Sequence, residues 1–202
     1  MDLKIIISSP SGAGKTTITR NLLKKVKNSK LSVSCTTRKP RPGEKHGTDY
    51  FFVSKKKFLE LKKKNKFLET AKVFNNYYGT LKSEIVSKQK NKIILLDIDW
   101  QGARIIRKKI KNNLHSFYLL PPNFKELKKR LFKRHRENIK IAEERISNAK
   151  NDMKHWFEYD EVFVNKNINR CSKEIMKNID LIILNRKKKN FINNFVKKFK
   201  FR

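Results

Sequence analysis

The chain has 202 residues, of which 51 are Lys or Arg and 18 are Asp or Glu, so its formal net charge is +33. This length suits one domain with small insertions. No stretch approaches the roughly 18 apolar residues of a membrane span, and the apolar run near the N-terminus is too short for a secretory leader. Cys35 and Cys171 are the only cysteines, too few for a disulfide framework, which favours a reducing, cytoplasmic location.

The positive charge is spread along the whole chain. Residues 186–202 contribute eight Lys and Arg and no acid, but most of the excess lies elsewhere. A basic patch would indicate nucleic-acid binding, whereas this distribution favours a solvated basic surface with only incidental affinity for polyanions. We interpret 187–202 as a basic C-terminal tail or helix whose phenylalanines pack on the body. Contact with a membrane surface or nucleic acid is the less favoured alternative.

The first elements predicted are a strand, a turn and a helix. Residues 3–7 form a short apolar, β-branched run typical of a buried strand. Residues 16–26 carry apolar side chains at helical spacing. Short alternating pieces with turn residues between 31 and 53 predict a small antiparallel insertion, and Ser54 is a candidate N-cap for a helix over 54–66.

The second half of the chain alternates strands and helices. The pattern predicts strands at 92–98, 116–120 and 162–164, helices at 123–136 and 139–155, and a helix or helix plus strand over 172–184. Strands that alternate with helices indicate an α/β protein with a parallel sheet covered on both faces.

A glycine-bearing turn connects the first strand to the first helix. Its residues are Ser9, Pro10, Ser11, Gly12, Ala13, Gly14, Lys15 and Thr16. Glycines allow the backbone to wrap around phosphate oxygens, and the helix N-terminus adds unpaired N–H groups. Lys15 is then suited to the β- and γ-phosphates and Thr16 to Mg²⁺. Although Ser9 stands where the strict motif has glycine, strand, loop and helix together predict a nucleoside triphosphate site rather than an accidental turn.

Further segments carry a family resemblance. They are Ser-Val-Ser-Cys-Thr-Thr-Arg-Lys-Pro-Arg-Pro-Gly-Glu at 32–44, Gly-Thr-Asp-Tyr-Phe-Phe-Val at 47–53, Phe-Leu-Glu-Thr-Ala at 67–71, Asn-Tyr-Tyr-Gly-Thr at 76–80 and Leu-Asp-Ile-Asp-Trp-Gln-Gly at 96–102. With the phosphate loop, these segments resemble the guanylate kinases in order and spacing over roughly 3–185. The resemblance implies transfer of the γ-phosphoryl group of ATP to GMP, with Mg²⁺, in purine nucleotide recycling.

The resemblance also implies a division of the chain. A phosphate-loop kinase core with a parallel sheet would comprise 1–31, 82–122 and 151–186. A small, mostly-β GMP-binding insertion would occupy 32–81, and a helical lid 123–150. The oligomeric state stays open between monomer and homodimer.

Arg38 and Arg41 lie three residues apart on one short loop. Two guanidinium groups can each bind a phosphate through paired hydrogen bonds, which lysine cannot do. Tyr50 and Tyr78 could add hydroxyl donors to the same phosphate. These four residues are therefore expected to hold the phosphate of GMP.

By resemblance, Ser34, Glu69 and Thr80 face the base. The Watson–Crick edge of guanine presents two neighbouring donors, which a carboxylate matches with two acceptors. Adenine lacks this pair of donors, so Glu69 should reject it. Taken alone, Glu69 reads as a solvated charge at a helix end.

Asp97 and Asp99 follow a predicted strand, where a phosphate-loop enzyme needs a carboxylate near the metal or its waters. We assign Asp97, with Thr16, to Mg²⁺, partly through water. The family implies that Asp99 lies near GMP. The sequence does not separate the two roles, and two acids capping a turn are the simpler alternative.

The basic run at 128–136 and Arg145 resemble the mobile lid of these kinases, in which arginines close over the phosphates. Arg130, Arg134 and Arg145 occupy the matching positions, although the glycines usual on either side of Arg134 are absent. Asn165 matches a position near adenine, with a turn residue as the alternative. The expected catalytic residues are Lys15, Arg41, Arg134 and Arg145.

A binding module that resembles these kinases but has lost catalysis is the main rival interpretation. Such modules typically have a degraded phosphate loop. Gly12, Gly14, Lys15 and Thr16 are all present here. The sequence therefore favours the enzyme.

Overall fold

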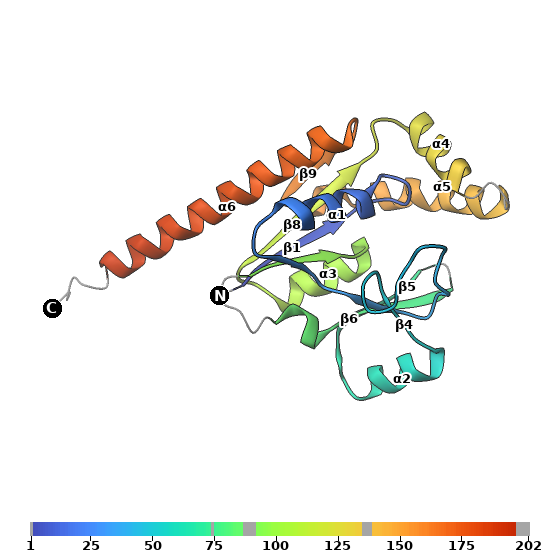
Figure 1. The fold of residues 1–202 in the computed structure, drawn as a ribbon, viewed down its shortest axis with the longest axis horizontal. Coiled ribbons are helices and arrows are strands. Elements are labelled where there is room, and N and C mark those ends of the chain that lie inside the picture. The colour runs from blue at the N-terminus through green and yellow to red at the C-terminus, as the bar shows by residue number, and fades with distance from the viewer. Residues whose placement is uncertain (1, 74, 87–91, 135–138, 197–202) are drawn as a thin grey trace.

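A parallel sheet of five strands forms the centre of the protein (Figure 1). The computed structural model describes residues 2–73, 75–86, 92–134 and 139–196. In spatial order the strands are β2 (Ser29–Leu31), β7 (Ile93–Asp97), β1 (Leu3–Ser8), β8 (Leu114–Leu120) and β9 (Glu161–Val164). Ile5 of β1 pairs with Leu95 on one side and His115 on the other. Every pair of neighbouring strands in this sheet is parallel, which confirms the predicted parallel sheet.

Helices cover both faces of this sheet. Side chains alternate along β1, so Ile5 and Ile7 pack with helices α1 (Lys15–Lys25) and α6 (Ile168–Val196). Ile6 points to the opposite face and packs with α3 (Trp100–Lys109). The carboxyl ends of the central strands are left for the connecting loops, which is where α/β sheets bind ligands.

The segment between β2 and β7 forms a separate sheet of four strands. Its order is β4 (Phe51–Phe52), β3 (Ser34–Thr36), β6 (Asn76–Leu81) and β5 (Phe67–Val73). The expectation of a purely antiparallel insertion is wrong, because β4 runs parallel to β3 while the other pairs are antiparallel. The long loop between β3 and β4 returns the chain to the same end of the sheet, as a parallel pair requires.

Helix α2 (Lys55–Lys63) covers this small sheet. Its Phe58 stacks on Phe67 with ring centres 4.5 Å apart. Ser54 accepts a hydrogen bond from the amide of Lys57, which confirms the predicted N-cap. A short 3₁₀ turn, η1 (Lys82–Ile85), then leads toward β7.

Two helices, α4 (Phe124–Arg134) and α5 (Ile139–Met153), form an arm above the sheet (Figure 1). They pack through Leu127, Leu131, Ile146 and Ala149. Both helices were predicted, although α5 ends slightly earlier and is followed by a 3₁₀ turn, η2 (Trp156–Glu158). Residues 135 and 136 of the predicted first helix lie outside the described residues, as does the side chain of Arg134.

The region 172–184 is entirely helical and belongs to α6, which has 29 residues. Its core-facing positions, from Cys171 to Ile182, follow helical spacing. Beyond them α6 runs away from the sheet (Figure 1), and Phe191 is 71% exposed. The prediction that this tail packs on the body is therefore wrong for Phe191, and the side chains of Phe195 and Phe199 lie outside the described residues.

Over the part of the chain that the structure describes, no helix combines the length and apolar character needed to cross a membrane. Cys35 and Cys171 are buried and not disulfide-bonded.

Candidate functional site

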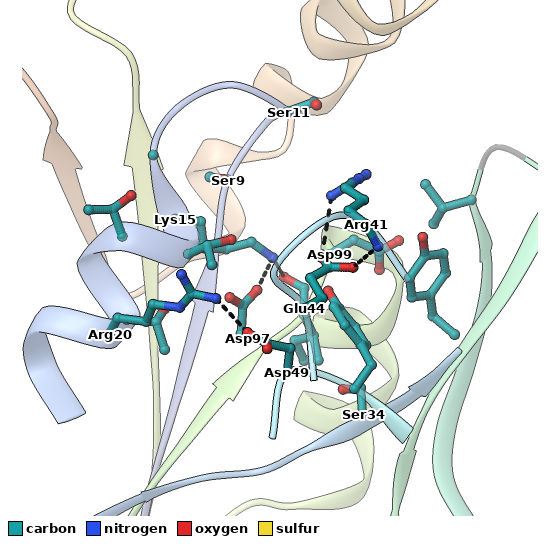
Figure 2. Close-up of a pocket in the computed structure, with 18 of the residues that line it drawn as sticks. Ser9, Ser11, Lys15, Arg20, Ser34, Arg41, Glu44, Asp49, Asp97 and Asp99 are labelled. Carbon is teal, nitrogen blue, oxygen red and sulfur yellow. Dashed lines mark hydrogen bonds and ion pairs between the residues drawn. The ribbon is translucent and has the colours of Figure 1, made fainter. Parts of the chain in front are cut away.

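A cleft of about 820 Å³ opens at the carboxyl ends of the central strands (Figure 2). The loop before α1, the small sheet and the lid helices all contribute to its walls. The predicted site residues that line it are Ser9, Pro10, Ser11, Gly12, Gly14, Lys15, Thr16, Ser34, Arg41, Tyr50, Glu69, Tyr78, Asp97, Asp99, Arg130 and Arg145. Ala13, Arg38, Thr80 and Asn165 are not among the lining residues. Segments far apart in sequence thus meet around one cavity.

The loop from Ser9 to Gly14 requires glycine at two positions. Gly12 and Gly14 have φ angles of 89° and 96°, in the left-handed region that other residues rarely adopt. Helix α1 begins directly after the loop at Lys15 and has no acid in its first turn. Its unpaired amides and dipole therefore favour an anion at this end of the cleft.

Lys15 and Asp97 form an ion pair at the mouth of the loop (Figure 2). Lys15 Nζ lies 2.5 Å from Asp97 Oδ1 and also donates to the carbonyl of Ile98 at 3.1 Å. Both side chains are only about one-fifth exposed, at 20% and 18%. The pair fixes the Lys15 ammonium group between the carboxyl end of β7 and the N-terminus of α1.

Asn165 supports the phosphate loop from behind. Its side chain is fully buried, and Nδ2 donates to the carbonyl of Ala13 at 2.8 Å. A Cβ atom at Gly14 would lie 2.5 Å from the same nitrogen. The structure thus gives Asn165 a contact with the loop backbone, and its expected contact with adenine stays a prediction.

Glu44 organises the two arginines of the small domain, a role that was not predicted. Arg38 Nη2 and Nη1 each lie 2.9 Å from one of the two carboxylate oxygens of Glu44. The Arg41 amide donates to Glu44 Oε2 at 2.7 Å, and Arg41 Nη1 lies 3.8 Å from Oε1 (Figure 2). Burial alone would raise the pKa of Glu44, but these partners outweigh it and lower the pKa. The only sequence signal for this role was that Glu44 follows Arg38 by six residues and Arg41 by three.

The aromatic residues predicted here lie beside this group. The Arg38 guanidinium carbon is 5.4 Å from the centre of the Tyr50 ring. Tyr50 and Tyr78 meet edge to face, with centres 6.0 Å apart. The Arg41 guanidinium and the two phenol rings therefore line one side of the cleft, while Arg38 contacts Tyr50 without lining it.

Glu69 is buried in β5, with only 5% of its surface exposed. Its Oε1 accepts two hydrogen bonds from Thr80, from the amide at 2.9 Å and from the hydroxyl at 2.7 Å. Burial raises the pKa of Glu69 to about 7, with the Thr80 hydrogen bonds acting in the opposite direction. Ser34 pairs with Thr80 across the sheet. The predicted base-facing trio is therefore contiguous.

Two more carboxylates stand near the floor of the cleft. Asp99 caps α3, accepting from the amide of Gly102 at 2.8 Å, and burial raises its pKa. Asp152, at the end of α5, accepts from Trp100 Nε1 at 3.1 Å, and burial raises its pKa to about 6. Asp152 was not predicted because no sequence motif distinguishes it within its helix.

Contacts from the lid and from α1 reach the cleft. Arg145 Nη1 lies 3.2 Å from Ser11 Oγ, so α5 touches the phosphate loop. Arg130 pairs with Glu126 at 2.9 Å. Arg20 of α1 lies 2.5 Å from Asp49, in the loop before β4 (Figure 2). The Arg145–Ser11 and Arg20–Asp49 contacts join separate walls of the cleft, whereas the Arg130–Glu126 pair stays within α4.

Comparison with known proteins gives one consistent result. A family model described as guanylate kinase matches residues 2–181. A guanylate kinase of Nitrobacter winogradskyi is 38% identical over 196 residues, covering 96% of this chain and 90% of its own length. One of Rickettsia bellii is 42% identical over 189 residues, covering 93% and 97%. A crystal structure of guanylate kinase from Anaplasma phagocytophilum has a TM-score of 0.75 at 31% identity, covering 89% of this chain and 85% of that chain.

Proposed function

The chain belongs to the guanylate kinase family, and we infer that it transfers the γ-phosphoryl group of ATP to GMP, giving ADP and GDP. One observation carries this conclusion. The glycine-containing loop with Lys15, the Arg41 guanidinium and the buried carboxylate of Glu69 all line the same cleft. Each feature fits a different part of the two substrates.

The phosphate of GMP would be bound on the side of the cleft that holds Arg41. Arg38 does not line the cleft, but it is paired with Glu44, which also contacts Arg41. Glu44 keeps two like-charged guanidinium groups close together before substrate arrives, which lowers the cost of ordering them on binding. Tyr50 and Tyr78 would donate hydroxyl hydrogen bonds to the same phosphate.

The guanine base would be read by Glu69. Because Thr80 occupies Oε1 with two hydrogen bonds, the carboxylate is fixed in place and Oε2 remains for donors of the base. Ser34 and Asp99 also line the cleft near this carboxylate. A preoriented acceptor in a buried site gives strong discrimination, since a mismatched base leaves a polar group unpaired.

The triphosphate of ATP would lie on the loop from Ser9 to Thr16. Phosphoryl transfer depends mainly on positioning and on neutralising charge that spreads over the transferred group. Lys15 is the cation best placed to neutralise this charge. Its ammonium group would leave Asp97 and pair with the phosphates instead. Arg145, already in contact with Ser11, would approach from the lid side with Arg130, and we assign Arg134 to the same role. Lid closure would exclude water, which could otherwise accept the phosphoryl group.

The residues present fit Mg²⁺. Thr16 and Asp97 both line the cleft and would supply oxygen ligands, which Mg²⁺ requires. No cluster of three acidic, histidine or cysteine side chains suited to a metal occurs among the described residues. A Mg²⁺ ion that is bound mainly by substrate phosphates and water usually has only one or two ligands from the protein. When bound, it would supply positive charge to the phosphates.

The products test this function directly. Incubation with ATP, GMP and Mg²⁺ should form ADP and GDP in equal amounts, as followed by ³¹P NMR. Release of inorganic phosphate without GDP, or binding of GMP without turnover, would contradict it. The second result would instead support a binding module that has lost catalysis.

A further inference from the structure

The carboxylate of Glu69 lies against the first turn of α3, at Gly102. A Cβ atom placed on Gly102 would be 2.8 Å from Glu69 Oε2 and 3.1 Å from its Cδ. Gly102 is not among the residues with positive φ, so its backbone conformation is open to any amino acid. Glycine inside a helix is less stable than alanine by about 0.5–1 kcal/mol. The backbone therefore gives no reason for glycine here, whereas the space beside Glu69 does.

We propose that Gly102 is a positioning residue for base recognition: its missing side chain leaves the space in which the Glu69 carboxylate stands. This inference rests on the proposed role of Glu69 in reading guanine. It assigns part of the specificity of the cleft to a residue that need not touch the substrate.

Neither the Glu69 carboxylate nor the Gly102 backbone can easily move away from the other. On one side, Thr80 holds Oε1 of Glu69 through two hydrogen bonds. On the other, the Gly102 amide is bonded to Asp99, and its neighbour Ala103 is fully buried against the central sheet. Lys109 at the far end of α3 donates to the carbonyl of Leu68, beside Glu69. A methyl group at position 102 would therefore displace the carboxylate or strain its hydrogen bonds, as overpacking does in a tight core.

The expected consequence is selective. The three atoms nearest to a Cβ at Gly102 belong to Glu69 and Asp99, whereas the phosphate loop that would hold ATP follows β1, not the strand that precedes α3. Gly102→Ala should therefore weaken the use of GMP and leave the KM for ATP nearly unchanged. A general packing defect would instead affect both substrates.

A double-mutant cycle tests the coupling between the two residues. The four proteins are wild type, Gly102→Ala, Glu69→Ala and the double variant, each assayed for kcat/KM with GMP and for KM with ATP. We expect Gly102→Ala to lower kcat/KM for GMP at least about tenfold, which corresponds to about 1.4 kcal/mol. In the Glu69→Ala background the same change should cost less than about twofold.

The outcomes separate the two proposals. Equal losses from Gly102→Ala in both backgrounds, or no loss in either, would overturn the role of Gly102. Unchanged use of GMP by Glu69→Ala would overturn the base-reading role of Glu69 instead. If Gly102→Ala folds poorly, the Tm of the four proteins still tests the contact between Gly102 and Glu69. Recovery of Tm in the double variant supports the contact between the two groups, whereas poor folding of both Gly102 variants contradicts it.

Discussion

Replacing Glu69 with glutamine alters only the charge and hydrogen-bonding capacity of the group proposed to read the base. The side chain keeps its size, but one carboxylate oxygen becomes an NH₂ donor. Thr80 donates two hydrogen bonds to Oε1, so the glutamine oxygen should take that position. The NH₂ group must then face the guanine edge, where the substrate also presents donors.

The magnitude follows from burial. Glu69 is 5% exposed, so a mismatched donor has little access to water. An unpaired buried donor costs about 1–3 kcal/mol, and loss of hydrogen bonds to a charged acceptor adds about as much. The two contributions sum to about 2–6 kcal/mol, and about 2.7 kcal/mol within this range already corresponds to the hundredfold loss in kcat/KM that we expect for GMP. AMP should be a poor substrate for both proteins and should lose much less, because adenine never made this pairing.

The assay measures ADP formation with GMP and with AMP, for the wild type and for Glu69→Gln, with folding verified by circular dichroism. The decisive quantity is how much more kcat/KM falls for GMP than for AMP when Glu69 is replaced. Equal losses for GMP and AMP, or no loss for either, would refute the assignment of Glu69 to base recognition.

Four further predictions concern the phosphate loop, the arginine pair, the pH dependence of stability and the tail. Lys15→Ala should lower kcat at least about a hundredfold with the fold intact, because it removes charge that stabilises the transition state; wild-type kcat would exclude the loop assignment. Glu44→Gln should raise the KM for GMP about tenfold with a smaller effect on kcat, since it weakens hydrogen bonds of a charged pair; an unchanged KM would show that the arginines need no partner. Because burial raises the pKa of Glu69 to about 7, its native form binds a proton more tightly than the unfolded chain, so stability should fall as pH rises from about 4.5 to about 7. Glu69→Gln should lack this dependence and exceed the wild type at pH 8 by about 1–3 kcal/mol in urea unfolding; identical pH profiles would contradict the raised pKa. Deletion of 187–202 should leave the KM for GMP unchanged and lower the free energy of unfolding by less than about 1 kcal/mol, since α6 leaves the body there; loss of GMP binding by the folded protein would reveal a role for the tail.

Elements with a strong local signal were predictable. Strands β1 and β7 are short segments rich in isoleucine and leucine, a composition that favours buried strands. Helix α1 follows a glycine-containing loop, and its apolar residues have clear helical spacing. By contrast, β2 consists of Ser29–Leu31 and is a strand only because it pairs with β7. Helix α3 also went unpredicted, since its first turn was interpreted as part of a motif, although Asp99 caps it.

The small sheet and the tail show how tertiary context overrides pattern. The parallel pairing of β4 depends on the path of the loop before it, which no local spacing encodes. Phe191 has the spacing of a packed helix face but lies where α6 has passed the end of the core. An amphipathic pattern predicts a buried face only where another element is present to cover it.

The site divides in the same way. Lys15 belongs to a loop whose chemistry can be inferred from residue type and spacing, whereas the role of Glu69 was implied only by the family resemblance. Glu44 and Asp152 could not be assigned, because their roles depend on contacts made by folding: a loop that wraps two arginines around a carboxylate, and a lid helix whose end reaches the cleft. Gly102 matters through an absent atom, and such a feature becomes visible only in three dimensions.

The central claim is that this cleft phosphorylates GMP and rejects other nucleoside monophosphates. A coupled assay of ADP formation with GMP, AMP, CMP and UMP as acceptors, at fixed ATP and Mg²⁺, measures it most directly. We predict that kcat/KM for GMP exceeds every other value by at least about a hundredfold, because only guanine presents two donors to Glu69. Absence of turnover with all four acceptors, or a kcat/KM for AMP equal to that for GMP, would contradict it.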